Sequence, residues 1–194
     1  MSDYLRTNRD HWNKAVDPHW DSEFYDVQGW LDGRESLRDI ELGLLPETLT
    51  GKSLLHLQCH FGQDTLSLAR RGAEVTGVDL SPRAIERARE LAELPGTFVE
   101  CDVLGLREHL DAAAAFDVVF TSYGTIGWLP DLDRWAAVIE HFLAPGGAFV
   151  MAEFHPMVWM FDDARERFEY SYFNRGPIVE ESQASYAADK AAST

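Results

Sequence analysis

The middle of the chain alternates between short apolar runs and segments in which apolar residues have helical spacing. The apolar runs cover residues 54–57, 75–78, 97–103, 115–120 and 148–153. The fourth run is almost continuously apolar, which is typical of a central parallel strand. Strands that alternate with helices predict an α/β fold with helices on both faces of a parallel sheet. We therefore expect a Rossmann-like, doubly wound, mostly parallel sheet in a three-layer αβα arrangement.

The two ends of the chain are less regular. A helix is predicted over residues 4–15, ending where Asp17-Pro18 breaks it, and another over about 35–45 before Pro46. We treat residues 1–50 as an N-terminal helical lid segment and 51–194 as the Rossmann-like domain, in one structural domain overall. Two further short strands are predicted at 168–173 and 178–182, and residues 184–194 have no clear pattern.

The segment from Ser53 to Ser81 predicts a strand, a tight turn, a helix and a second strand that ends in Asp79. A helix that follows a parallel strand presents free N–H groups and a partial positive charge. An acidic residue at the tip of the second strand suits a ribose, because its carboxylate accepts hydrogen bonds from two vicinal hydroxyls. Together these features predict a site for a nucleoside-containing cofactor.

The turn of this unit bears on which cofactor is bound. It reads Gln58-Cys59-His60-Phe61-Gly62 and contains one glycine, whereas a dinucleotide fold requires G-x-G-x-x-G. A Walker phosphate loop is also absent from the sequence. Bulky side chains leave little room for a pyrophosphate, so an NAD-dependent oxidoreductase is the less favoured alternative.

The turn and the strand before it resemble the first motif of the class I S-adenosylmethionine-dependent methyltransferases. Residues 54–62, LLHLQCHFG, align with V-L-D-L-G-C-G-x-G; Cys59 and Gly62 agree, whereas His56 replaces the acidic residue. The HLQCHFG variant resembles a bacterial small-molecule-type subset of these enzymes, over roughly residues 8–182. The family marker L-x-P-G-G is similar to residues 143–147, LAPGG.

This resemblance implies a transferase that uses S-adenosyl-L-methionine to methylate a small-molecule acceptor and releases S-adenosyl-L-homocysteine (EC 2.1.1). The family fold has seven strands, of which the pattern supports five, so the chain resembles a member that lacks the last strands, truncated at its C-terminus. That loss favours an alternative, a non-catalytic or regulatory S-adenosylmethionine-binding protein. An edge strand left open would also favour a homo-oligomer.

The resemblance also implies roles for individual residues. The methionine and ribose side of the cofactor would be bracketed by Gln58, Cys59, His60 and Gly62. Asp79 would hold the ribose hydroxyls and Leu80 would pack on the adenine, whose edge Asp102 and Val103 would read. The floor near the sulfur would be formed by Thr121 and Ser122, and the cover by Trp12, Tyr25 and Ser36.

The acceptor pocket is predicted from the two segments that follow the fourth and fifth strands. We assign it Tyr123, Trp128 and His155. His155 is also the candidate general base, because an unperturbed imidazole titrates near neutral pH. Its alternative role is to shape the turn before Pro156.

Other residues also have structural alternatives. Asp79 could cap the helix that begins at Ser81-Pro82, and Asp102 could cap a turn. The spacing of His56, Cys59 and His60 fits no metal motif, so no metal is expected. We interpret Cys59 and Cys101 as small buried hydrophobic residues and not as a disulfide.

Charge and hydropathy restrict the partners. The net charge of −16 and the pI of about 4.7 disfavour nucleic acid, whose phosphates would be repelled. No apolar run reaches membrane-spanning length, and the N-terminal residues do not resemble a signal peptide. We therefore expect a cytoplasmic protein with no membrane or nucleic-acid partner.

Overall fold

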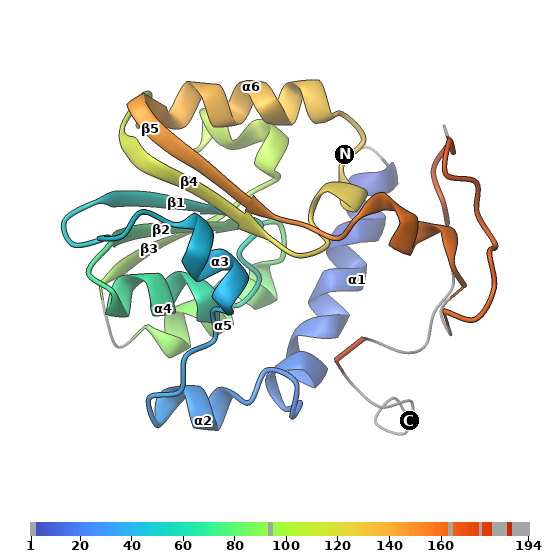
Figure 1. Ribbon diagram of the computed structural model, residues 1–194, viewed down its shortest axis with the longest axis horizontal. Helices are drawn as coiled ribbons and strands as arrows, with labels where there is room; N and C mark the ends of the chain where they lie inside the picture. Colours follow the sequence, from blue (N-terminus) through green and yellow to red (C-terminus); the bar gives the residue numbers. More distant parts are fainter. Residues whose placement is uncertain (1–2, 93–94, 163–164, 175, 180–185, 188–194) are drawn as a thin grey trace.

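A parallel β-sheet forms the centre of the computed structural model, which describes residues 3–92, 95–162, 165–174, 176–179 and 186–187. Its five strands are β1 (Ser53–Leu57), β2 (Glu74–Asp79), β3 (Gly96–Glu100), β4 (Phe116–Ser122) and β5 (Leu143–Ala152). They lie in the order β3-β2-β1-β4-β5 (Figure 1), and every pairing is parallel. The predicted Rossmann-like fold is therefore confirmed.

Helices cover both faces of the sheet because successive strand residues point to opposite sides. Leu55 and Leu57 pack with α6 (Leu132–Phe142) and the 3-10 helix η1 (Val103–Glu108). Leu54 packs on the other face with α4 (Gln63–Arg70) and with residues next to α3 (Asp39–Leu44). The helix α5 (Pro82–Leu91) buries Ile85, Ala88 and Leu91 beside α4. These elements make up the expected three layers.

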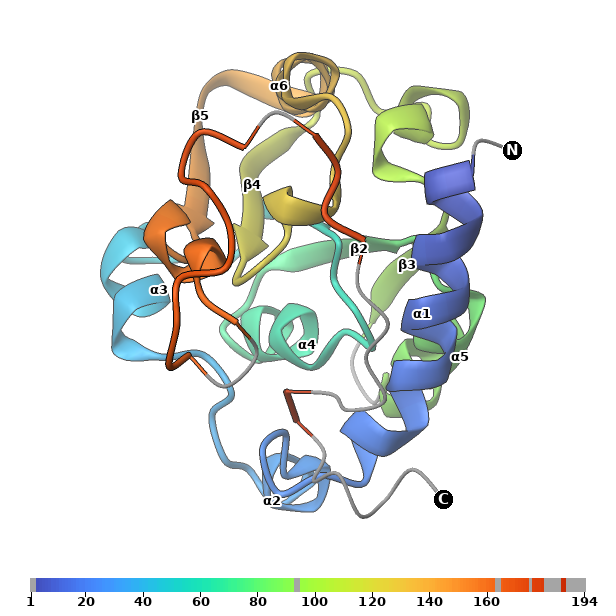
Figure 2. The same cartoon turned by 90° about the vertical axis from the view of Figure 1, so that its right-hand side faces the viewer.

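The first helix, α1 (Asp3–Trp20), is longer than predicted and contains Pro18. The expected break at Asp17-Pro18 is wrong. Pro18 lies on the exposed side of the helix, whereas Val16 and His19 are buried. Packing of the inner face thus outweighs the helix-breaking effect of the proline. In Figures 1 and 2, α1 crosses the carboxyl ends of the strands and lies beside α5.

The second predicted N-terminal helix is shorter than expected. After α2 (Val27–Leu31), helix α3 begins at Asp39 and not near residue 35. The Glu35 carboxylate accepts hydrogen bonds from the N–H groups of Ser36 and Leu37, at 3.0 and 3.2 Å, and so holds this segment in a turn. The local side-chain bonds compete with helix formation, as is usual at turns.

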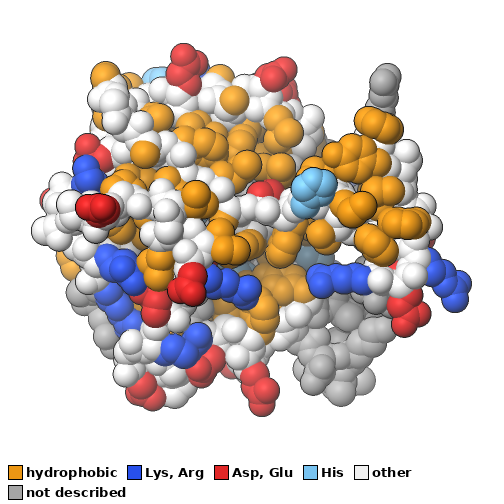
Figure 3. Space-filling model, in the orientation of Figure 1, with side chains coloured by type: hydrophobic (Ala, Val, Ile, Leu, Met, Phe, Trp, Pro, Cys, Tyr) orange, Lys and Arg blue, Asp and Glu red, His pale blue; other side chains and the backbone are white. Residues whose placement is uncertain are grey.

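The strand predicted at 168–173 is not formed. After β5 come η3 (Pro156–Met160) and an isolated bridge between Phe161 and Phe168. Phe168 and Phe173 are 65% and 81% exposed, so no neighbouring element supports a strand there. Ile178 and Val179 of the other predicted strand are not in a strand, and its residues 180–182 lie outside the described residues. Hydrophobic side chains gather over β5 and over the segment that follows it (Figure 3).

Candidate active site

The carboxyl ends of the strands meet at one edge of the sheet, where the predicted site residues come together. The register pairs Leu57 with Val78 and Ser122 with Ala152. The residues that follow these strands, such as Gln58 and Glu153, therefore lie at the same edge. Figure 2 looks onto this edge, with α1 beside it.

The turn after β1 has a compact left-handed geometry. The φ angles of Gln58, His60 and Gly62 are 56°, 51° and 74°. Gly62 is required because a Cβ atom there would lie 2.7 Å from the Phe98 ring. Gln58 and His60 adopt the unusual conformation with full side chains, which predicts that these side chains contribute contacts that glycine could not.

Two acceptor or donor atoms of this turn are buried without a partner. These atoms are Gln58 Oε1 and His60 Nδ1. Among the described residues, Arg9 Nε and Trp135 Nε1 are also buried without a hydrogen-bond partner. A buried unpaired polar atom is costly, so its presence in a turn of this kind indicates a position for a ligand. The turn therefore fits a cofactor that carries hydrogen-bonding groups.

Asp79, at the end of β2, holds both sides of the turn. Its two carboxylate oxygens accept hydrogen bonds from the N–H groups of His60 and Ser81, each at 2.8 Å. The N-cap of α5 is Ser81, whose hydroxyl accepts from Ala84 N–H. Burial raises the pKa of Asp79 to about 6, although the bonds from Ser81 and His60 favour its charged form. The ribose role remains a prediction.

Asp102 caps a short helical turn, which is the structural role given above as the alternative to adenine binding. It is the N-cap of η1 and accepts a hydrogen bond from Leu104 N–H at 3.2 Å. Val103 is buried in the core, whereas Leu80 is half-buried beside Asp79. The adenine contacts assigned to these residues remain predictions.

The inner face of α1 and the residues after it pack on the turn. The Trp12 ring lies 5.5 Å from the His60 ring and 5.2 Å from Trp128, and the Tyr25 ring lies 5.7 Å from His60. Trp12 and Tyr25 thus lie next to the turn, and their role as a cover over the cofactor remains a prediction. Ser36 contacts a different element, through its hydroxyl 2.7 Å from Ser67 on α4.

His19 is a residue at this site that the sequence reasoning missed. It is fully buried, and its Nδ1 lies 2.9 Å from His60 Nε2. Burial lowers the pKa of His19 to about 4 and also lowers that of His60, so both imidazoles are neutral near pH 7. The spacing of Trp12 and His19, seven residues apart on one helix face, is the signal that could have identified it.

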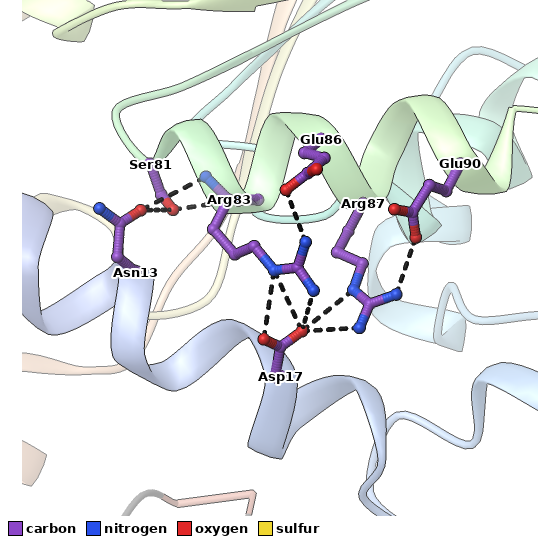
Figure 4. A network of polar contacts seen from close by, with 8 residues as sticks. Asn13, Asp17, Ser81, Arg83, Glu86, Arg87 and Glu90 are labelled. Carbon is purple, nitrogen blue, oxygen red and sulfur yellow. Dashed lines mark hydrogen bonds and ion pairs between the residues drawn. The ribbon is translucent and has the colours of Figure 1, made fainter.

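Polar contacts fasten α1 to α5 next to Asp79 (Figure 4). Asn13 Oδ1 accepts hydrogen bonds from the Ser81 hydroxyl at 2.6 Å and from Arg83 N–H at 3.3 Å. Asp17 forms ion pairs with Arg83 and Arg87 at 2.8 and 2.7 Å. These contacts fix one wall of the site.

The opposite wall is the loop 123–128. Its anchor is Glu153, whose carboxylate accepts from the N–H groups of Gly124, Thr125 and Ile126 at 2.5, 2.8 and 3.2 Å. The sequence pattern predicts Glu153 at a strand end but indicates no role for it. The buried Thr121 hydroxyl lies 3.3 Å from Leu57 O and 3.1 Å from the Thr125 hydroxyl. Its place in the floor near the sulfur remains a prediction.

The residues predicted to line the pocket for the methyl acceptor do not form one cluster. The Tyr123 hydroxyl donates to the buried Glu41 at 2.9 Å, whereas Trp128 packs on α1 through Trp12. His155 is exposed, and its Nδ1 accepts from Met157 N–H at 3.2 Å, so it shapes the turn of η3. The general-base role of His155 remains a prediction.

Of the histidine and cysteine residues of the first motif, His56 and Cys59 lie within the core, whereas His60 is half-buried. His56 is buried in β1 with its Nδ1 2.8 Å from the Thr65 hydroxyl, and burial lowers its pKa to about 3. Cys59 and Cys101 are buried free thiols, as expected. Among the described residues, no group of three or more potential ligands is arranged to hold a metal ion.

The fold and the turn define a Rossmann-like methyltransferase domain, and comparison with known proteins supports this class. Residues 54–147 match a family model described as "Methyltransferase domain". An uncharacterized methyltransferase of Synechocystis sp. is 36% identical over 115 residues, 57% of this chain and 51% of that protein. A ubiquinone biosynthesis O-methyltransferase of Pectobacterium atrosepticum is 28% identical over 72% of this chain and 59% of that protein.

A solved structure extends the likeness to three dimensions. The S-adenosylmethionine-dependent methyltransferase from Mesorhizobium loti is 28% identical with a TM-score of 0.56, over 68% of this chain and 59% of that chain. The resemblance to the class I S-adenosylmethionine-dependent methyltransferases is confirmed, with just under half of the chain matching the family model. The chain spans about half to three-fifths of the length of these relatives. In the part of the chain that the structure describes, no helix is both long and apolar enough to cross a membrane.

Proposed function

We propose that this protein binds S-adenosyl-L-methionine at the turn after β1 and transfers its methyl group to a small-molecule acceptor. The observation that carries the proposal is the hydrogen bonding of Asp79. A carboxylate has about four positions for hydrogen bonds. Two backbone N–H groups have hydrogen-bond geometry to Asp79, one on each oxygen, and the Leu80 N–H lies near enough to favour its charged form. The two positions that remain match the two vicinal hydroxyls of a ribose.

The other groups of the site suit the rest of this cofactor. Gln58 Oε1 and His60 Nδ1 are unpaired polar atoms on the turn itself. Burial and Tyr186 raise the pKa of the Tyr25 hydroxyl, and the carboxyls of Asp64 and Asp79 raise it further, so two acidic groups lie near this hydroxyl. Such surroundings favour a sulfonium and an ammonium group. Leu80, Asp102 and Val103 are proposed to contact the adenine.

The protein's part in the reaction would be alignment. The sulfonium of the cofactor supplies an activated methyl group. Loop 123–128, held by Glu153, would position the acceptor oxygen, nitrogen or carbon in line with it. His155 would accept the acceptor's proton only if its exposed imidazole reaches the acceptor, so the proposal does not depend on a base.

The relatives support a small-molecule acceptor, since they include O-methyltransferases of ubiquinone biosynthesis and of magnesium-protoporphyrin. The match to the magnesium-protoporphyrin enzyme of Rhodobacter capsulatus covers 30% of this chain. The cytoplasmic location, the absence of a nucleic-acid partner and homo-oligomer formation stay predictions from the sequence.

Calorimetric titration with S-adenosyl-L-homocysteine and, in parallel, with NAD tests the proposal. Saturable 1:1 binding of the first ligand alone is expected. Binding of NAD would support the oxidoreductase alternative and contradict the proposal. Binding of S-adenosyl-L-homocysteine without methyl transfer from labelled cofactor to any of a broad set of small phenols, amines and carboxylic acids would favour the regulatory alternative.

A further inference from the structure

The Gln58 side-chain amide has one paired end and one unpaired end. Its Nε2 donates a hydrogen bond to the Thr125 carbonyl at 2.9 Å, whereas its Oε1 is buried without a partner. Turning the amide over would set Oε1 against the Thr125 carbonyl, and two acceptors repel each other. The contact with Thr125 therefore decides which atom is left for a ligand. Oε1 is shielded from solvent.

Thr125 is a fixed point of the loop 123–128. Its N–H donates to the Glu153 carboxylate at 2.8 Å, and its hydroxyl receives a hydrogen bond from Thr121 at 3.1 Å. The residue is 7% exposed. A side chain of the cofactor turn thus contacts a residue of the loop that Glu153 and Thr121 also hold.

We propose that Gln58 is a positioning residue that couples cofactor binding at the turn to the order of the loop 123–128. The inference rests on the proposed cofactor binding. A donor group of the bound cofactor at Oε1 fixes the amide, and the fixed amide holds the Thr125 carbonyl through Nε2. Without that donor, rotation of the amide relieves the unpaired Oε1 and releases Thr125. Such coupling acts equally in both directions.

This coupling implies that the cofactor binds before the methyl acceptor does. Tyr123 and Trp128, the predicted acceptor residues, belong to the loop that Thr125 and Glu153 hold. Cofactor binding would therefore complete the acceptor side of the site. Glycine at the same position of the turn has no side chain and could not form this connection.

Hydrogen exchange of the Gly124, Thr125 and Ile126 amides in the full chain, with and without saturating S-adenosyl-L-homocysteine, tests the proposal. In the wild-type protein the ligand is expected to slow exchange about 5-fold or more. In Gln58→Met the slowing should fall below about 2-fold, because methionine has the same reach but neither polar end. Neither side chain is β-branched, so the left-handed backbone is equally strained in both. The exposed Gln28→Met, on α2, is the matched control and should keep the wild-type ratio.

The ratio of exchange rates separates coupling from a purely structural role. If Gln58 only supports the loop, Gln58→Met speeds exchange equally in the free and bound protein and the ratio stays unchanged, which would overturn the proposal. Wild-type protein that binds the ligand without slowed exchange would overturn it as well, and would leave cofactor binding intact. Failure of the wild-type protein to bind would overturn the proposed function itself.

The reverse direction gives an independent measurement that does not need the Gln58 variant. Glu153→Gln replaces a carboxylate oxygen with an amide that cannot accept, and so loosens the loop. By reciprocity it should weaken S-adenosyl-L-homocysteine binding about 3-fold. The exposed Glu140→Gln, on α6, should leave the affinity unchanged. Equal affinities in the two variants would contradict the proposal.

Discussion

Asp79 and Glu153 are two carboxylates that occupy equivalent places, at the carboxyl ends of β2 and β5, yet they are used differently. Asp79 accepts from two backbone N–H groups, those of His60 and Ser81. Glu153 accepts from the backbone N–H groups of Gly124, Thr125, Ile126 and Phe154, and from the Thr125 hydroxyl at 3.4 Å.

The difference separates a ligand site from a structural anchor. A carboxylate offers about four hydrogen-bonding positions, so Glu153 is saturated by its own chain, whereas Asp79 retains about two. An acidic residue at a strand end is therefore not enough to identify a ligand contact. The number of positions that the protein leaves open is the better criterion.

Exchanging the two carboxylates for alanine tests this comparison most strongly. Asp79→Ala should weaken S-adenosyl-L-homocysteine binding about 100-fold, since it removes two charge-assisted hydrogen bonds of about 1.5 kcal/mol each. Glu153→Ala should lower the free energy of unfolding by about 2 kcal/mol, because several loop N–H groups lose their acceptor, and reduce the affinity less than 10-fold. Calorimetry and urea denaturation measure the two quantities.

Asp79→Asn controls for the two backbone N–H groups that the alanine variant leaves unpaired, because asparagine keeps an acceptor oxygen. It should restore part of the stability but little of the affinity. The comparison fails if Asp79→Ala binds with nearly wild-type affinity, or if Glu153→Ala loses as much affinity as Asp79→Ala.

The sequence allowed the prediction of most of the fold and of the place of Asp79 at the end of β2, whereas its ribose role stays a prediction. The apolar runs matched strands because a parallel strand buried on both faces is apolar throughout, as at Val118–Phe120. Asp79 was identifiable because the strand that carries it ends in a polar residue next to a helix start. Both signals are local in the sequence.

The missed features depend on contacts between distant residues. His19 meets His60 across 41 positions, and Glu153 meets Thr125 across 28. The sequence pattern predicts the end of α1 too early, because the helix propensity of Pro18 does not include the burial of its neighbour His19. Conversely, residue type alone makes His155 a candidate base, although its Nδ1 accepts a hydrogen bond from Met157 N–H two residues away.

The pH dependence of binding sharpens the role of Asp79. Burial raises its pKa to about 6, so the folded protein binds this proton more tightly than the unfolded chain does. Its contribution to stability is therefore full below the unfolded pKa near 3.9 and is lost as the pH rises through about 6. Ligand binding has the opposite sign, because a ribose requires the ionised carboxylate. The affinity for S-adenosyl-L-homocysteine should fall about 4-fold between pH 7.5 and about pH 5.5.

Asp64 complicates this titration, because burial also raises its pKa to about 6. Asp79→Asn separates the two groups, since it removes the contribution of Asp79 alone. Calorimetric titrations of both proteins at the two pH values provide the comparison. A pH dependence that is the same in Asp79→Asn and in the wild type would assign the effect to another group.

Asp17 is a third kind of carboxylate, paired with side chains at the surface, and should show the smallest effect. The exposed fractions of the Asp17, Arg83 and Arg87 side chains are 48%, 30% and 22%. The ion-pair distances from Asp17 are nevertheless short, 2.8 Å to Arg83 and 2.7 Å to Arg87. Solvent screens such pairs, so Asp17→Asn should lower the free energy of unfolding by about 0.5 kcal/mol. The difference should shrink further in about 1 M salt.

The matched control is Asp10→Asn, an exposed aspartate of the same helix. Urea denaturation of both variants and of the wild type measures the difference. A loss for Asp17→Asn as large as that for Glu153→Ala would show that α1 is held mainly by its ion pairs. Burial of Val16 and His19 on its inner face argues for the opposite, because apolar contact is the larger contribution where charges remain in water.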